Sequence, residues 1–155
     1  MQFSSKEDIE APIDAVFAML SEFETFERRA IRRGAEVQRS GDLRPPRVGM
    51  SWDARFVLRG KTRDLHIELT EYQPPNGMKF AASSPNLQGG FAIELMALSP
   101  RRTRVSIKVT VDPKTLAARL LLQSLRLAKK NLNKRFKLRF ANFIKDMEER
   151  HSRRA

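Results

Sequence analysis

Apolar and polar residues alternate along much of residues 35–112, and this period of two constrains the fold more than any other feature of the sequence. The alternation is clearest in residues 51–58, 65–70 and 104–111. Successive side chains of a strand point to opposite faces, so each segment predicts a strand with one covered face and one solvated face. Such strands are typical of antiparallel sheets.

Turn residues divide this region into six expected strands. Gly60, residues 74–77 and residues 99–102 carry the Gly, Pro and Asn signals that end a strand. Residues 1–10 predict a further strand, and Gly89-Gly90 is interpreted as a bend at a strand edge. The six strands are expected at 35–40, 50–59, 62–72, 78–84, 90–98 and 103–111.

Helices are expected on both sides of the strand region. Pro12 favours a helix start, because proline is well tolerated in the first turn, and a second helical segment covers residues 21–33. Asp112 as N-cap and Pro113 as first residue predict a C-terminal helix over about 113–150. Such a helix would be about 54 Å long, whereas a ten-residue strand spans about 33 Å. The helix must therefore overhang the sheet, bend or break.

One face of this expected helix is apolar, with a single interruption at Lys129. Burying an unpaired ammonium group is costly. Lys129 could bind the acidic or carbonyl end of an otherwise apolar ligand; alternatively, its side chain reaches the helix edge or the helix bends there. The stripe recurs at spacings of three and four and comprises Ala118, Leu122, Leu125, Leu132, Phe136, Phe140, Phe143 and Met147.

The net charge of +12 lies almost entirely in this helix. Residues 114–155 carry 13 basic and 3 acidic side chains, whereas residues 1–113 carry 17 and 15. On the side opposite the apolar stripe, Leu116, Leu120 and Leu127 are flanked by Arg and Lys. This pattern suits an anionic membrane surface or self-association. Nucleic acid is a less expected partner, because the aromatic residues fall on apolar faces.

Several kinds of chemistry are absent from the sequence. There is no Cys, and His66 and His151 lack metal-ligand spacing, so neither a metal nor a cofactor is expected. Asp53, Arg55, Arg63 and Tyr72 could serve acid–base chemistry, but nothing in their spacing selects them. Residues 1–10 are charged, and no run of about 18 apolar residues occurs, so a cytoplasmic protein is expected. The length is that of a single domain over residues 1–155.

The order of elements resembles the helix-grip fold of the START-like, or SRPBCC, superfamily, which includes the birch-pollen allergens. Residues 9–17, Ile-Glu-Ala-Pro-Ile-Asp-Ala-Val-Phe, resemble the opening of many bacterial members of its polyketide cyclase/dehydrase and lipid-transport group. The resemblance implies an α+β fold in which a seven-stranded antiparallel sheet wraps around a long C-terminal helix, after two short helices that follow the first strand.

The same resemblance implies an apolar cavity for a hydrophobic or amphipathic small molecule, such as a lipid, quinone or polyketide. A filled core is the alternative. The superfamily also contains enzymes and a ribosome-associated toxin, so a cyclase or dehydratase, or a ribosome- or RNA-associated regulator using the basic helix, remains open. The expected cavity lining comprises Trp52, Phe56, Ile67, Phe80, Phe91, Ile93, Leu122, Leu125, Lys129, Leu132 and Phe136.

Overall fold

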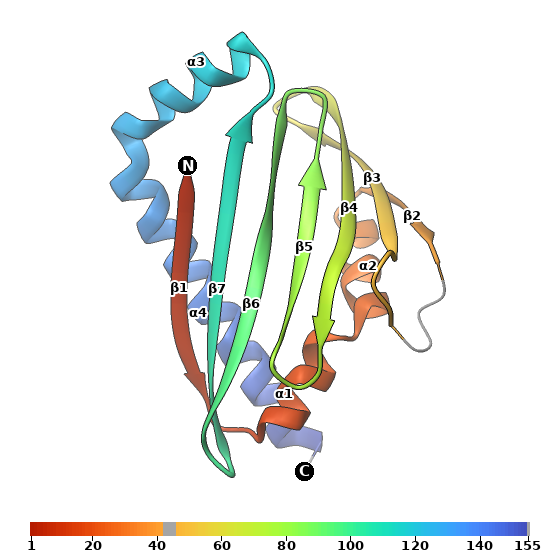
Figure 1. Ribbon diagram of the computed structural model, residues 1–155, viewed down its shortest axis with the longest axis vertical. Coiled ribbons are helices and arrows are strands. Elements are labelled where there is room, and N and C mark those ends of the chain that lie inside the picture. Colours follow the sequence, from red (N-terminus) through yellow and green to blue (C-terminus); the bar gives the residue numbers. More distant parts are fainter. Residues whose placement is uncertain (42–45, 155) are drawn as a thin grey trace.

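The computed structural model describes residues 1–41 and 46–154. Seven strands form one antiparallel sheet in the order β1-β7-β6-β5-β4-β3-β2 (Figure 1). Every predicted strand is confirmed, with ends within three residues of those expected. The strands are β1 (Gln2–Ile9), β2 (Glu36–Ser40), β3 (Ser51–Leu58), β4 (Lys61–Gln73), β5 (Gly77–Ser83), β6 (Leu87–Ser99) and β7 (Arg102–Pro113).

The helices gather on one face of this sheet, which we call the inner face. In Figure 1, α1, α2 and α4 lie behind the sheet, and α4 crosses it diagonally. The arrangement is the predicted helix-grip fold. Its helical elements are α1 (Ile13–Leu20), α2 (Phe23–Arg32), α3 (Leu116–Leu125), the 3₁₀ turn η1 (Arg126–Ala128) and α4 (Lys129–Arg154).

The predicted start of the C-terminal helix is wrong. Asp112 and Pro113 belong to β7, where they pair with Gln88 and Leu87 of β6. The ladder keeps the chain extended through Pro113, which a strand tolerates at its end. The N-cap is Thr115, whose hydroxyl oxygen accepts the Ala118 N–H at 3.1 Å.

Gly89 and Gly90 also lie elsewhere than expected. They stand within β6 and pair with residues of both β5 and β7, instead of forming a bend at a strand edge. A Cβ atom at Gly89 would collide with the Thr110 carbonyl oxygen, and one at Gly90 with that of Phe80. Glycine here allows neighbouring backbones to approach closely.

The long helix breaks in two at η1, one of the three outcomes expected from its length. No Gly or Pro marks the break. Beyond it, α4 buries Phe140, Ile144 and Met147, whereas α3 buries Ala118 and Leu122.

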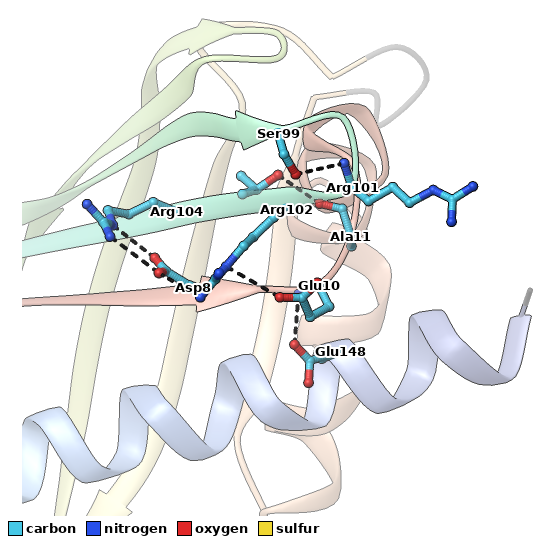
Figure 2. A network of polar contacts seen from close by, with 9 residues as sticks. Asp8, Glu10, Ala11, Ser99, Arg101, Arg102, Arg104 and Glu148 are labelled. Atoms are coloured by element: carbon cyan, nitrogen blue, oxygen red, sulfur yellow. Dashed lines mark hydrogen bonds and ion pairs between the residues drawn. The ribbon is translucent and has the colours of Figure 1, made fainter.

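One end of the sheet is closed by polar contacts as well as by apolar packing. The Thr103 hydroxyl, fully buried, donates to the Ala11 carbonyl at 2.8 Å. The Glu10 N–H donates to a Glu148 carboxylate oxygen, also at 2.8 Å (Figure 2). These bonds tie β7, the β1–α1 connection and α4 together, so the helices are held against this end.

An arginine–aspartate network joins β1 to β7 on the outer face at the same end. Arg104 Nε donates to Asp8 Oδ1 at 2.9 Å, and Arg102 Nη2 lies 3.4 Å from Asp8 Oδ2 (Figure 2). The hydrogen bond from Arg104 holds the pKa of Asp8 below its ordinary value.

Candidate functional site

Burial on the inner face changes along the length of the strands. Close to α1 the inward apolar side chains are fully covered, whereas toward the α3 end they are partly exposed. On β4, for example, Leu69 is completely buried and Leu65 is partly exposed. The same change separates Leu95 from Phe91 on β6, and Val105 from Val109 on β7.

The helices account for this gradient. Residues of α1, of α2 and of the C-terminal half of α4 form the buried cluster with the covered part of the sheet. At the other end the C-terminal helix is α3, which the break at η1 separates from α4, and the sheet side chains there are only partly covered. We call the partly exposed region the open half of the inner face. Its sheet side chains are Phe56, Leu65, Ile67, Phe80, Phe91, Val109 and Val111.

Aromatic rings connect the buried half to the open half. Phe23 of α2 packs edge-on against Trp52, with 5.4 Å between ring centroids, and against Phe80 at 6.0 Å. Phe80 in turn stacks on Phe91, with centroids 4.5 Å apart. Phe91 is thus stacked on the Phe80 ring on one side and is partly exposed to solvent.

The predicted lining residues of the sheet all lie on the inner face. The predicted lining residues of α3 and α4 lie on the side of these helices that turns toward the inner face, except Lys129. Trp52 and Leu122 are buried; the others are partly exposed, namely Phe56, Ile67, Phe80, Phe91, Ile93, Leu125, Leu132 and Phe136.

Phe3 is a wall residue that the sequence reasoning missed. Its ring lies 5.8 Å from that of Phe136, so β1 contributes to the surface beside α4. Phe3 is six residues before the buried Ile9, so the two share one face of β1, and this parity is the signal in the sequence that identifies Phe3.

Lys129 is exposed and stands at the first residue of α4, directly after the 3₁₀ turn. A bend of the helix at this position, one of the alternatives considered, therefore accounts for a cation within the apolar stripe. Arg63 is a second exposed cation, on β4 in register with Phe56 and therefore on the inner face. Arg63 therefore belongs to the open half.

The acid–base candidates do not converge. Asp53 and Arg55 lie on the outer face, where Asp53 Oδ1 is 2.7 Å from His66 Nδ1. Arg55 Nε donates to Asp64 at 2.8 Å, and the hydrogen bond raises the pKa of Arg55. On the inner face, the Tyr72 hydroxyl donates to Ser21 Oγ at 2.9 Å.

A cleft of about 520 Å³ surrounds the Asp53–His66 pair on the outer face. Ser83 is the cross-strand neighbour of His66, but its hydroxyl accepts a hydrogen bond from Lys114 Nζ at 3.2 Å. Among the described residues no hydrogen bond joins Ser83 to His66. The cleft therefore lacks the nucleophile–base contact that a hydrolytic triad requires.

Residues 1–41 and 46–154 contain no cluster of three or more His, Asp or Glu side chains placed to hold a metal ion. No helix in the described part of the chain is both long and apolar enough to span a bilayer.

The fold is shared with several solved structures. TTHA0849 from Thermus thermophilus aligns at 16% identity with a TM-score of 0.66, covering 97% of this chain and 96% of that one. The Zhui aromatase/cyclase from Streptomyces sp. R1128 aligns at 12% identity and TM-score 0.67, covering 98% and 95%. A START superfamily protein from Mycobacterium smegmatis aligns at 15% and 0.53, covering 86% and 95%. No curated protein matches the sequence.

A family model described as "polyketide cyclase / dehydrase and lipid transport" matches residues 1–148. The match includes all seven strands and most of the C-terminal helix, and the helix-grip architecture agrees with it. The chain therefore belongs to the polyketide cyclase / dehydrase and lipid transport family.

Proposed function

We propose that this protein binds or carries a hydrophobic or amphipathic small molecule on the open half of its inner face. The observation that supports this proposal is the burial gradient. Leu65, Phe91 and Val109 occupy inward positions yet remain partly exposed, although the same strands bury Leu69 and Val105 completely. Fully burying a large apolar side chain is worth about 1.5–3 kcal/mol, so a ligand that covers several of them gains affinity.

The ligand's chemistry follows from the wall. The stacked Phe80–Phe91 pair offers a flat apolar surface to rings or to an acyl chain. Arg63 is exposed on the open half and Lys129 is exposed at the break of the C-terminal helix, and such cations suit a carboxylate or a polarised carbonyl at one end of the ligand. Lipids with an acidic head, quinones and polyketides all combine these properties.

Membership of the family supports a ligand of this class, since its description joins polyketide chemistry to lipid transport. Binding or transport is preferred over catalysis because, of the two acid–base candidates on the inner face, Tyr72 already donates its hydroxyl to Ser21 and Arg63 is a guanidinium that stays protonated. A cyclase or dehydratase would need an acid–base pair directed into the open half.

Two measurements test the proposal. An organic extract of the purified protein, analysed by mass spectrometry, should contain a defined lipid, quinone or polyketide. A fluorescent fatty acid should bind saturably to the delipidated protein. Phe91→Asp should weaken that binding at least about tenfold, because a charge replaces an apolar wall residue. Met96→Asp, on the same strand but exposed on the outer face, is the matched control. Empty extracts together with no saturable binding would overturn the proposal.

The polar end of the site has its own test. Lys129→Met and Arg63→Met should weaken binding of a fatty acid more than binding of the alcohol of equal chain length. Lys130→Met is the control for Lys129, because the neighbouring residue stands on another side of the helix. Equal affinities for acid and alcohol in the unmodified protein would exclude a role for either cation.

A further inference from the structure

The C-terminal helices carry an unusual excess of unpaired positive charge. From Pro113 to Lys145 the sequence has ten Lys and Arg residues and neither Asp nor Glu. All ten are exposed. Within the described part of the chain none of them forms an ion pair, whereas Arg39, Arg55 and Arg104 elsewhere pair with acids at 2.8–2.9 Å. Since the acids of these helices all follow Lys145, the charge of the preceding residues is available to an external anion.

Five leucines on the same segment are exposed as well, and three of them, Leu116, Leu120 and Leu127, lie on α3 and η1 at positions that share one side of the helix. Leu116 is 71% exposed, Leu120 57% and Leu127 93%. At about 100° per residue these positions fall close together on one side of the helix. We call them the leucine ridge. Single exposed apolar residues are ordinary, but three on one side of α3 and the adjoining η1 turn indicate an interaction surface.

The ridge and the cations form one amphipathic surface. Arg119, Arg126 and Lys130 follow one flank of the leucine ridge by helical position. The opposite side of α3 buries Ala118 and Leu122 against the protein, so the ridge faces away from it. In Figure 1, α3 lies at the end of the molecule remote from α1, where no other described element covers it.

The chemistry of this surface distinguishes among partners. A second copy docked through the same ridge would bring two sets of Arg119, Arg126 and Lys130 together, with no acid on either helix to compensate. A nucleic acid would satisfy the cations but leave the leucines in water, and the surface has no aromatic platform. An anionic bilayer satisfies both, because leucines enter the acyl boundary while cations stay among the headgroups.

We propose that α3 and η1 dock this protein on an anionic lipid bilayer. Leu116, Leu120 and Leu127 insert at the headgroup boundary, and Arg119, Arg126 and Lys130 bind the anionic headgroups. Because the open half of the inner face lies toward the α3 end, docking brings it close to the bilayer. A hydrophobic ligand could then be exchanged with the membrane without crossing bulk water, a step that rests on the proposed function.

Co-sedimentation of the full chain with vesicles tests the docking. The protein should bind vesicles of equimolar phosphatidylcholine and phosphatidylglycerol, bind vesicles of phosphatidylcholine alone far more weakly, and lose affinity as salt is added. Equal binding to both compositions, or binding to neither, would overturn the proposal.

Variants identify the surface. Arg126→Gln with Lys130→Gln should lower affinity for the anionic vesicles about 25-fold, since each cation contributes about fivefold. Arg32→Gln with Arg33→Gln removes the same charge from exposed positions at the end of α2 and should change affinity little. Leu120→Ser with Leu127→Ser should lower affinity about a hundredfold. Ile31→Ser with Met96→Ser is the matched control, as both residues are exposed.

Competing partners give different results. A concentration-dependent dimer in sedimentation that Leu127→Ser abolishes would overturn the proposal in favour of self-association. RNA binding that the leucine variants retain, together with weak vesicle binding, would overturn it in favour of nucleic acid.

Fatty-acid binding is measured on the same variants without vesicles. It should be unchanged when docking is lost, because the leucine ridge faces away from the open half. If the unmodified protein binds vesicles but does not bind the fatty acid, the proposed function is rejected and the proposed docking is retained.

Discussion

Phe80 of β5 and Phe91 of β6 stack on the inner face of the sheet, with ring centroids 4.5 Å apart and ring planes inclined by 18°. Phe80 belongs to the periphery of the buried cluster through its contact with Phe23, whereas Phe91 does not. The pair therefore stands at the boundary between the part of the inner face that the helices bury and the part that they leave open.

Substitutions in the buried half of the inner face should lower the free energy of unfolding more than substitutions in the open half. Leu69→Ala should reduce the free energy of unfolding by about 2–5 kcal/mol, because Leu69 is completely buried. Phe91→Ala should cost about 1–2 kcal/mol, despite the larger side chain, because its ring is partly exposed and loses mainly the contact with Phe80. Urea denaturation of both variants measures the difference. If Phe91→Ala proves the more costly, the open half is packed as an ordinary core.

The Asp8–Arg104 bond should make stability depend on acid pH. Because Arg104 lowers the pKa of Asp8 in the folded protein, the unfolded chain binds the proton more readily. The contribution of Asp8 is therefore complete above the ordinary aspartate pKa and is lost as the pH falls through the lowered folded value. Asp8→Asn should be less stable than the unmodified protein at neutral pH, and the gap should close in acid. Urea denaturation across a pH series measures this difference in the free energy of unfolding. Glu68→Gln, at an exposed position of β4, is the control. A difference that widens in acid would contradict the stabilising role of the Asp8–Arg104 bond.

The helix cap at Thr115 should control the local stability of α3. Thr115→Ala removes the acceptor of the Ala118 N–H and should cost about 1 kcal/mol. Since α3 buries only two of its side chains, the loss should appear as amide hydrogen exchange about fivefold faster in α3, with the sheet unchanged. Thr115→Ser keeps the hydroxyl and should behave like the unmodified protein. Faster exchange throughout the sheet would mean that α3 unfolds together with the core.

Gly89 should tolerate no side chain. In Gly89→Ala the added Cβ meets the Thr110 carbonyl oxygen, so β6 and β7 must separate locally. Overpacking of this kind costs about 1–3 kcal/mol, measured as a lower thermal midpoint and urea midpoint. Ala92→Ser, on the same strand, is the control for substitution within β6. A Gly89→Ala variant with an unchanged midpoint would show that the strands can yield without cost.

The elements and their faces were predictable because the signals are local. Alternation of side chains along β3, β4 and β7 follows from the geometry of a strand, whatever it packs against. The helix start was predicted wrongly because Asp112 and Pro113 carry the local signature of a cap, whereas pairing with β6 holds them in a strand. No local rule contains that pairing, since the partners Gln88 and Leu87 stand 24 and 26 residues earlier in the chain.

The sequence predicts which residues face the candidate site, but it does not predict how far each of them is exposed. The inward parity of Phe80, Phe91 and Ile93 could be read from the strands, whereas their exposure could not. The position of Lys129 was recognised as anomalous, yet only the break at η1 explains why its ammonium group can remain exposed.

The strands, the apolar stripe of the C-terminal helix and the acid-free run of cations follow from the order of the amino acids, because each depends on neighbours within a few residues. Three further features emerge only when the chain is folded: the position of the helix break, the half of the inner face that is covered and the leucines that remain exposed. These features depend on how α1, α2 and α4 share one face of the sheet, and that packing joins residues more than a hundred positions apart.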